Sequence, residues 1–233
     1  MATHATASRE DWLTARKDLL SREKALSRER DAIAQARRDL PWVKIETDYV
    51  FETEAGPASL EDLFDGHFQL IVQHFMLGPD WDNGCVSCSF WADGFNGTIP
   101  HLNARDIAFK VVARAPLAKI LPFKQRMGWT FEWVSSFGGT FNEDFGVSFG
   151  PDHKPENKVN YNFLETNFPA DEAPGASAFV KDDDGTVYHT YSTYSRGLDV
   201  LNNAYAYMDM APHGRDEVAE GHKMGWLRHH DSY

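Results

Sequence analysis

Residues 68–88 read FQLIVQHFMLGPDWDNGCVSC, and they contain the features that decide the fold of this 233-residue chain. The apolar run over residues 68–77 predicts a buried strand. Turn-forming residues follow from Gly78 to Gly84 and lead to a CxxC pair, Cys85 and Cys88. A strand, a loop and a cysteine pair in this order predict that the first cysteine lies where a helix begins.

The position of Cys85 predicts a reactive thiol. A cysteine at a helix start feels a partial positive charge and free backbone amides, and both favour the thiolate, which is the reactive form. Cys88 lies about one helical turn further on, close enough to attack a mixed disulfide formed at Cys85. We therefore expect Cys85 to be the nucleophile and Cys88 the resolving thiol. Asp80 and Asp82 lie just upstream, and their negative charge opposes thiolate formation.

Two other interpretations of the cysteine pair stay open. A CxxC pair can be half of a metal site, but no second CxxC exists, so a zinc or copper ion would take its other ligands from the histidines. Both cysteines can also be buried hydrophobic residues without chemistry. We expect no other cofactor. A permanent disulfide has little value in a reducing cytosol.

Upstream of the strand, the sequence predicts a long amphipathic helix over residues 9–40. Apolar residues recur there at a spacing of seven, and no glycine or proline lies between them: Trp12, Leu19, Leu26, Ile33 and Leu40. Pro41 ends the helix. The second seam that a coiled coil needs falls largely on charged residues, so we expect the apolar stripe to pack against its own domain or a partner subunit. A homodimer is therefore one of the expected partners.

Downstream of the cysteines, predicted strands and helices alternate, which indicates an α/β fold. We expect further strands over residues 43–45, 49–53, 107–113, 129–133, 177–181 and 186–191, helices over residues 60–64, 116–127 and 198–208, and an irregular connection over residues 150–175. The last two strands flank Asp183, Asp184 and Gly185, which predicts a hairpin.

Charge and composition exclude several classes of protein. Lysine and arginine number 23 against 35 aspartates and glutamates, so the net charge of −12 would repel a nucleic acid. The first ten residues lack the features of a secretory signal, and no apolar run is long enough to span a membrane. We therefore expect a cytoplasmic protein with neither nucleic-acid nor membrane partners.

Three segments resemble a known family: WDNGCVSCSFWADGFNG (81–97), RMGWTFEWVSSFGGTFNEDFGVSF (126–149) and VYHTYSTYSRGLD (187–199). The sequence is similar over roughly residues 10–215 to the bacterial thioredoxin-like family catalogued as domain of unknown function 899. The resemblance implies a thioredoxin-like fold, with a central mixed sheet flanked by helices. Members are usually labelled predicted dithiol-disulfide oxidoreductases. The resemblance therefore implies an oxidoreductase activity whose substrate is a thiol or a disulfide, either in a protein or in a small molecule.

These considerations predict three parts of the chain. Residues 1–40 form a helical extension, residues 41–215 form the thioredoxin-like domain, and residues 216–233 form a C-terminal tail.

The sequence departs from thioredoxin and from the peroxiredoxin relatives of this fold. Thioredoxins carry tryptophan before the first cysteine and Gly-Pro between the two, whereas Gly84 precedes Cys85 and Val86 and Ser87 follow it. The redox potential of thioredoxin therefore cannot be assigned to this cysteine pair. A proline usually comes directly before the strand that faces the dithiol, but Pro174 lies three residues ahead of the predicted strand. Peroxiredoxins carry threonine or serine three residues before their cysteine, and Asp82 here disfavours a standard peroxiredoxin, while a peroxide-reactive thiol stays open.

Trp81, His189, Tyr191 and Arg196 are candidate supporting residues. His189 and Tyr191 are expected to share one face of a strand, and a hydrogen-bonded structural edge explains the cluster equally well. 

Other polar residues have structural interpretations. His74, within the buried strand, is expected to be a hydrogen-bonded core residue rather than a ligand. Arg126 is expected to pair with a carboxylate, and Gly128 to close the preceding helix.

Overall fold

The computed structural model describes residues 4–150, 152–217 and 223–233. It divides the chain into two compact units, Met1–Pro41 and Trp42–Tyr233. Residues 1–3, 151 and 218–222, which fall in the predicted extension, domain and tail respectively, lie outside the described residues.

The first unit contains one long helix, α1, Arg9–Arg38. The Ser8 side chain caps its start by accepting a hydrogen bond of 3.1 Å from the backbone N–H of Asp11. Acidic residues lie in the first turn and basic residues in the last, which suits the helix dipole. The predicted helix over residues 9–40 is therefore confirmed. The apolar stripe is exposed, with Leu19 at 47% and Leu26 at 52%, and its partner stays a prediction.

The second unit is built on an eight-stranded mixed sheet with the strand order β1-β10-β9-β4-β5-β6-β2-β3. Its strands are β1 (Val43–Lys44), β2 (Val50–Thr53), β3 (Gly56–Ser59), β4 (Gln69–His74), β5 (Ile107–Ala113), β6 (Trp133–Ser135), β9 (Gly175–Lys181) and β10 (Val187–Tyr194), while β7 (Lys158–Tyr161) and β8 (Leu164–Asn167) form a separate pair. The helices are α2 (Val86–Ala92), α3 (Phe95–Asn103), α4 (Leu117–Arg126), α5 (Phe141–Asp144) and α6 (Asn203–Met208), with short 3-10 turns η1 (Asp62–Phe64), η2 (Ser195–Leu201) and η3 (His230–Ser232).

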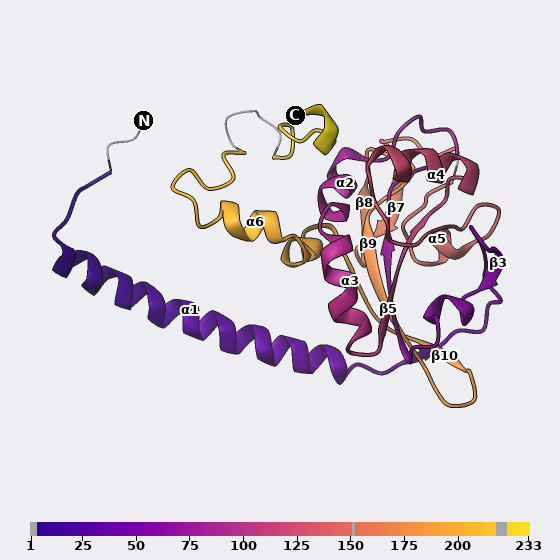
Figure 1. The fold of residues 1–233 in the computed structure, drawn as a ribbon, viewed down its shortest axis with the longest axis horizontal. Coiled ribbons are helices and arrows are strands. Elements are labelled where there is room, and N and C mark those ends of the chain that lie inside the picture. Colours follow the sequence, from indigo (N-terminus) through magenta and orange to yellow (C-terminus); the bar gives the residue numbers. More distant parts are fainter. Residues whose placement is uncertain (1–3, 151, 218–222) are drawn as a thin grey trace. The chain divides into compact units, whose positions relative to one another are not determined.

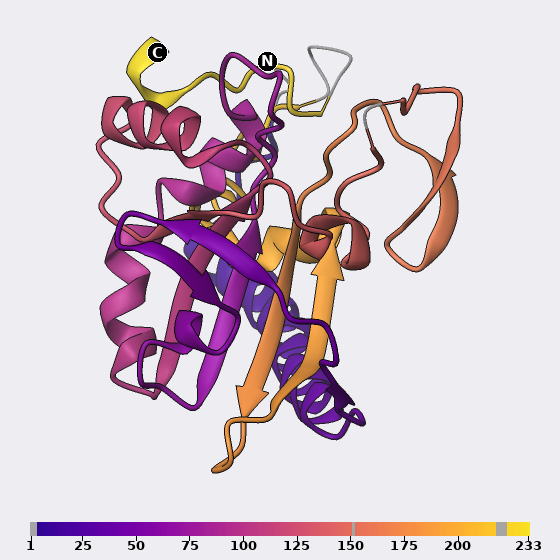
Figure 2. The ribbon, with the colours of Figure 1, turned by 90° about the vertical axis from the view of Figure 1, so that its right-hand side faces the viewer.

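The centre of this sheet has the thioredoxin-like arrangement. β4 and β5 are parallel and are joined through α2 and α3, as in a βαβ unit. β9 then pairs antiparallel with β4, and β10 pairs antiparallel with β9. Figure 1 shows α2 and α3 on one side of the sheet and α5 on the other. In Figure 2 the hairpin of β9 and β10, drawn in orange, has its turn at the bottom of the view.

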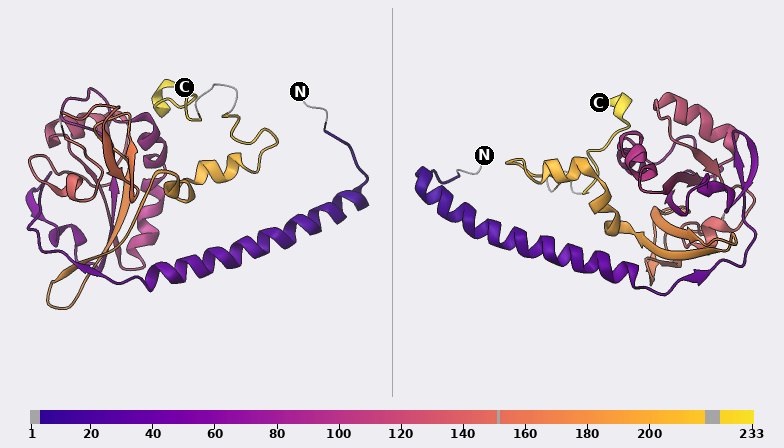
Figure 3. Two further views of the ribbon diagram at one scale, coloured as in Figure 1. Left: turned by 180° about the vertical axis from the view of Figure 1, so that it is seen from behind. Right: turned by 60° about the horizontal axis from the view of Figure 1, so that its bottom comes forward.

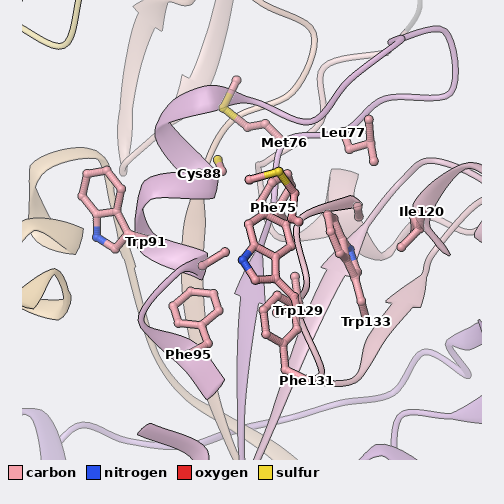
Figure 4. Close-up of a cluster of buried hydrophobic side chains, with 14 of the residues drawn as sticks. Phe75, Met76, Leu77, Cys88, Trp91, Phe95, Ile120, Trp129, Phe131 and Trp133 are labelled. Carbon is pink, nitrogen blue, oxygen red and sulfur yellow. The ribbon is translucent and has the colours of Figure 1, made fainter. Parts of the chain in front are cut away.

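Two hydrophobic clusters cover the two faces of the sheet. On β4, Leu70 and Val72 belong to the cluster that also contains Phe64 and Phe141, from η1 and α5. Odd-numbered positions of this segment point the other way because strand side chains alternate. Phe75 and Leu77 accordingly belong to the cluster that holds Cys88 and the aromatic residues of α2 and α3. Figure 4 shows this second cluster, with Cys88 on the side of α2 that faces Phe75 and Met76.

Several predicted elements differ from the observed ones. Of the predicted strand over residues 129–133, only Trp133 is in β6, although Trp129 and Phe131 are also buried. Their alternation reflects a chain that packs its rings into one cluster without pairing to a neighbour strand. The predicted irregular connection contains the β7–β8 hairpin, and the predicted final helix divides into η2 and α6 at Asn202, which caps α6 by accepting from Tyr205 N. The short β3 is not predicted from the sequence pattern.

Candidate dithiol site

Cys85 lies at the junction between the long loop after β4 and helix α2. It is the N-cap residue of α2, and its backbone N–H donates a hydrogen bond of 3.0 Å to the carbonyl of Met76. Its own carbonyl accepts from the backbone N–H of Ser89 at 2.9 Å, the first bond of the helix. The strand end and the helix start therefore hold Cys85 on both sides. Both cysteines are free thiols, with Cys85 half-buried and Cys88 buried.

The two thiols have opposite pKa shifts. The pKa of Cys85 is lowered to about 7, mainly because the Cys88 thiol donates a hydrogen bond to it and also because the amides of Cys88 and Ser87 face it, and these effects exceed the opposing effect of burial. The pKa of Cys88 is raised because this thiol donates to Cys85 and is buried. Neither Asp80 nor Asp82 is among the main causes, so the predicted electrostatic opposition is not a leading effect. α2 has only seven residues, and its first-turn amides act on Cys85 directly.

The residue before Cys85 has to be glycine. A Cβ atom at Gly84 would lie 2.5 Å from the Phe123 ring and 2.7 Å from the Phe75 ring. Both rings are buried in the cluster beneath the dithiol, so they have little room to move. This packing explains why the tryptophan of thioredoxin has no counterpart at this position.

The C-terminal segment, residues 223–233, packs against the dithiol loop. Nε2 of His229 lies 3.0 Å from the Gly84 carbonyl oxygen, and the His229 ring contacts Phe123. Arg126 forms an ion pair of 2.8 Å with Asp231 and donates to Asn83 Oδ1 at 2.8 Å, which confirms its predicted carboxylate partner. In Figure 3 this segment, drawn in yellow, lies beside α2 and α4. Gly128, with φ of +63°, ends α4 as predicted.

A cavity of about 440 Å³ opens beside the two thiols. Its apolar wall consists mainly of Met76, Trp91, Phe168, Pro169, Leu198 and Met224. Its polar lining consists of Gln73, Ser87, Ser195, Arg196 and Asp199. The cavity therefore joins residues from β4, α2, the β8–β9 connection, η2 and the C-terminal segment around Cys85.

The connection before β9 forms one wall of the cavity. Pro174 lines it, and the Pro174 carbonyl accepts a hydrogen bond of 2.7 Å from the Tyr161 hydroxyl. Tyr161 in turn accepts a bond of 2.9 Å from the backbone N–H of Ser195. The prediction that Pro174 lies three residues too early is wrong, because β9 begins at Gly175 and Pro174 directly precedes it.

The structure brings one of the four predicted supporting residues to the cavity. Arg196 lines it and pairs with Asp199 at 3.0 Å. The Trp81 indole donates to Asp171 at 2.9 Å, and Trp81 is not part of the described lining of the cavity. His189 bonds to Ser192 at 2.7 Å and packs against Phe145, in the cluster on the opposite face of the sheet.

The prediction that His189 and Tyr191 share a face is also wrong. A bulge between them pairs His189 with Phe179 and Tyr191 with Ala178. Because adjacent residues of β9 point to opposite faces, so do His189 and Tyr191. Nothing in the sequence signals this extra residue.

His74 is a hydrogen-bonded core residue, as predicted. It is fully buried, and its Nε2 lies 2.8 Å from the Ser177 hydroxyl. Burial lowers its pKa to about 3, so the ring is neutral.

Metal binding and membrane spanning have no structural support in the part of the chain that the structure describes. Within residues 4–150, 152–217 and 223–233, no three His, Cys, Asp or Glu side chains are grouped so that they could hold a metal ion. Among the helices described, none has both the length and the apolar character needed to cross a bilayer.

Sequence reasoning missed Gln73, Met76, Tyr161, Asp199 and Met224 as residues of this site. Gln73 carried a signal, because it is a polar residue within an apolar strand. Met76 lies in the apolar run just ahead of the dithiol loop. Tyr161, Asp199 and Met224 come from distant segments, and only the tertiary fold places them beside Cys85.

Comparisons with known proteins give one family and a set of distant structures. The model of a family described as "Bacterial protein of unknown function (DUF899)" matches residues 1–233. None of the curated proteins matches the sequence. Similar solved structures include peroxiredoxin Q of Xanthomonas campestris, with a TM-score of 0.47, 13% identity and coverage of 72% of this chain and 98% of that one. Peroxidoxin BcpB from Mycobacterium tuberculosis has a TM-score of 0.45, 15% identity and coverage of 70% and 94%.

Proposed function

We propose that this chain, which belongs to the bacterial family DUF899, is a thiol-disulfide oxidoreductase in which Cys85 is the nucleophile and Cys88 the resolving thiol. The observation that carries the proposal is the paired geometry of the two thiols. Cys85 caps α2 and accepts a hydrogen bond from Cys88, which lies below it in the apolar cluster. One thiol is thereby prepared for attack and the other is kept protonated.

The reaction proceeds in two exchanges. The Cys85 thiolate attacks one sulfur of a disulfide R–S–S–R′, forms Cys85–S–S–R, and releases R′S⁻. Cys88 then loses its proton and attacks the sulfur of Cys85, which forms the Cys85–Cys88 disulfide and releases RS⁻. The substrate gains two electrons and the protein loses two. An external dithiol then reduces the Cys85–Cys88 disulfide and is itself oxidised, which returns the protein to its reduced form.

The pKa of Cys85 suits this chemistry. A thiol whose pKa lies near the ambient pH is the best attacking group, because it combines a large thiolate fraction with good nucleophilicity. A pKa of about 7 for Cys85 meets that condition at neutral pH. Once Cys85 is in a mixed disulfide it no longer accepts the bond from Cys88, so the hydrogen bond that holds the Cys88 proton is lost. This loss favours the second exchange.

Intact mass spectrometry across a series of dithiol redox buffers tests the proposal. We expect the wild type to lose two hydrogens in one reversible step. Cys88→Ser, incubated with oxidised glutathione, should accumulate a mixed disulfide at Cys85, because a monothiol cannot resolve its own adduct. Cys85→Ser is the matched control and should form no adduct of comparable yield. A wild-type protein that stays fully reduced in every buffer, or a Cys85→Ser variant as active as the wild type, would refute the mechanism.

The metal-binding alternative, with zinc or copper on the cysteines and histidines, has no observation in its favour. His74 is the histidine of the central strand, and it lies on the opposite face of the sheet, against Phe141 and Phe145. Elemental analysis of the purified protein would revive the alternative if it found a stoichiometric metal that Cys85→Ser loses.

A further inference from the structure

The cavity beside Cys85 has the dimensions of a small-molecule site. Its volume of about 440 Å³ lies within the range of roughly 300–1,000 Å³ that is usual for such sites. It is lined mostly by apolar side chains, with a few polar groups among them. Cys88 is only 6% exposed and Cys85 is half-buried, so the reacting sulfur faces a recess rather than a flat surface.

One polar residue in this cavity directs its side-chain amide at the cavity itself. Gln73 is 4% exposed and lines the cavity, and its amide is not among the described polar atoms that are sealed in the core without a partner. The amide is therefore accessible from the cavity, where water can bond to it. A ligand that displaces this water keeps the interaction only if it offers Gln73 a polar atom of its own.

The strand register places Gln73 on the same side of the sheet as the dithiol. It pairs with Val111 on β5 and with Ala176 on β9, and both belong to the cluster that contains Cys88. Cys85, Cys88 and Gln73 line one and the same cavity. A ligand whose sulfur reaches Cys85 therefore has the Gln73 amide within the same space.

The charges around the cavity favour an uncharged ligand. Arg196 and Asp199 lie 3.0 Å apart and balance each other, and Asp199 also pairs with Arg215 at 3.3 Å. The chain as a whole has a net charge of −12, which repels anions at long range. The remaining lining provides apolar surface and single hydrogen-bonding groups.

We propose that this cavity is the substrate site of the dithiol, that it binds a small uncharged organic disulfide, and that the side-chain amide of Gln73 is the group that recognises it. This inference rests on the proposed function and adds the substrate class to it. The Cys85 thiolate attacks the bound disulfide R–S–S–R, releases RSH after proton uptake, and the second exchange releases the other RSH from the cavity. The amide contributes a hydrogen bond to a polar atom of R and positions the S–S bond.

Three disulfides distinguish this substrate class from the alternatives. 4,4′-Dithiodipyridine is uncharged at neutral pH and offers a hydrogen-bond acceptor, 5,5′-dithiobis(2-nitrobenzoate) is a dianion, and insulin presents protein disulfides. Rates of reaction with reduced protein are divided by the rates of free cysteine with the same reagent. We expect the normalised rate with the uncharged reagent to exceed the normalised rates with the other two by at least about tenfold. One lost hydrogen bond, or an electrostatic repulsion of similar size, produces a difference of this magnitude.

Gln73→Leu tests the role of the amide, with Gln69→Leu as the matched control. Gln69 lies on the same strand but is exposed and outside the described lining of the cavity. We expect Gln73→Leu to lower the rate with 4,4′-dithiodipyridine about tenfold, while its alkylation by iodoacetamide stays at the wild-type rate. Gln69→Leu should match the wild type in both. Gln73→Met, which keeps the side-chain length, serves the same purpose if the leucine variant folds poorly.

The stability of Gln73→Leu distinguishes a role of Gln73 in ligand binding from a role in holding the fold together. Replacing an amide that faces a cavity and supports no other part of the fold by an apolar side chain of similar size is neutral or stabilising, so urea unfolding of Gln73→Leu should show an unchanged or raised free energy of unfolding. Lower stability together with an unchanged exchange rate would overturn the proposal for Gln73.

A last experiment distinguishes an error in the proposed substrate site from an error in the proposed function. 1,2-Bis(4-pyridyl)ethane carries the same two pyridine rings on a two-atom linker that contains no S–S bond, so its binding to Cys85→Ser can be measured by calorimetry without chemistry. Saturable binding that Gln73→Leu weakens supports the site even if exchange fails. If the reduced wild type releases no thiol from any of the three reagents, the proposed function is refuted. Exchange with insulin at the same normalised rate, unaffected by Gln73→Leu, refutes only the substrate site.

Discussion

At the scale of single residues, one hydrogen bond is the largest cause of the lowered pKa of Cys85. The largest contribution to its lowered pKa comes from the Cys88 thiol, and burial acts in the opposite direction. The nucleophile of the proposed reaction is therefore tuned by its own resolving partner, with the amides of the first turn of α2 in second place.

The pH dependence of alkylation tests this assignment. In the wild type, the rate of iodoacetamide modification at Cys85 should rise with a midpoint at about pH 7. Cys88→Ala removes the largest lowering effect and should move the midpoint to higher pH, because burial is then opposed only by the smaller effects of the Ser87 and residue-88 groups. Cys88→Ser keeps a donor and should stay near the wild type. Equal midpoints in the alanine and serine variants would contradict the assignment.

Glu172 is a second residue with an unusual protonation state. It is 1% exposed, and its Oε1 accepts bonds from Arg114 at 2.5 Å and Ser148 at 3.0 Å, whereas its buried Oε2 has no partner among the described residues. Burial outweighs Arg114 and raises its pKa from 4.5 to about 7. The folded state therefore binds a proton more tightly than the unfolded state, and the stabilisation it provides is present below pH 4.5 and lost as the pH rises through 7.

Glu172→Gln should remove this pH dependence. We expect the difference in free energy of unfolding between wild type and variant to fall by on the order of 3 kcal/mol between pH 4.5 and pH 8. Urea unfolding at four or five pH values measures it. Taking the difference cancels groups that titrate equally in both proteins, among them His74, whose lowered pKa has the opposite effect. A difference that does not vary with pH would show that Glu172 titrates normally.

At the scale of elements, the junction between the β4 loop and α2 is the most constrained part of the site. Gly84→Ala places a methyl group against Phe123 and Phe75 and should destabilise the fold by about 1–3 kcal/mol. Gly97→Ala is the matched control, because Gly97 lies within α3 with no atom near its would-be Cβ and should be neutral or stabilising by up to about 1 kcal/mol. Denaturant unfolding compares them, and equal stabilities would mean that the rings can move aside.

The elements that sequence patterns predict are those whose signal is local. β4, β5 and the α4 helix follow from apolar runs and from Pro116, and the β9–β10 hairpin follows from its turn residues. The position of Cys85 at a helix start follows from the order of strand, loop and cysteine pair. The bulge in β10 and the β7–β8 hairpin depend on what their neighbours in space require, and no local pattern encodes them.

The residues of the cavity also divide into those with a local sequence signal and those without one. Arg196 is predicted as a candidate because it lies in an unusual polar cluster, and it does line the cavity. Tyr161 and Met224 reach the cavity through segments that are distant in sequence from the dithiol, so their roles are invisible without the fold.

At the scale of the whole molecule, the described residues of the site lie within one of the two units. Those that line the cavity all belong to Trp42–Tyr233. Deleting residues 1–41 should therefore leave the melting temperature and the alkylation rate of Cys85 close to those of the full chain. A loss of thiol reactivity would show that the first unit contributes to the site.

The same deletion tests the predicted role of α1 in dimer formation. If the apolar stripe of α1 joins two subunits, light scattering should show the mass of a dimer for the full chain and of a monomer for the shortened one. An unchanged oligomeric state would exclude α1 as the contact.

The contact between His229 and the Gly84 carbonyl has a consequence for synthesis in the cell. Cys85 and Cys88 are translated well before Met224 and His229, because synthesis runs from the N-terminus. The nascent chain therefore passes through a stage at which both thiols have left the ribosome and the segment that contains Met224 and His229 has not. During that stage the two thiols lack the cover that this segment gives them in the folded protein.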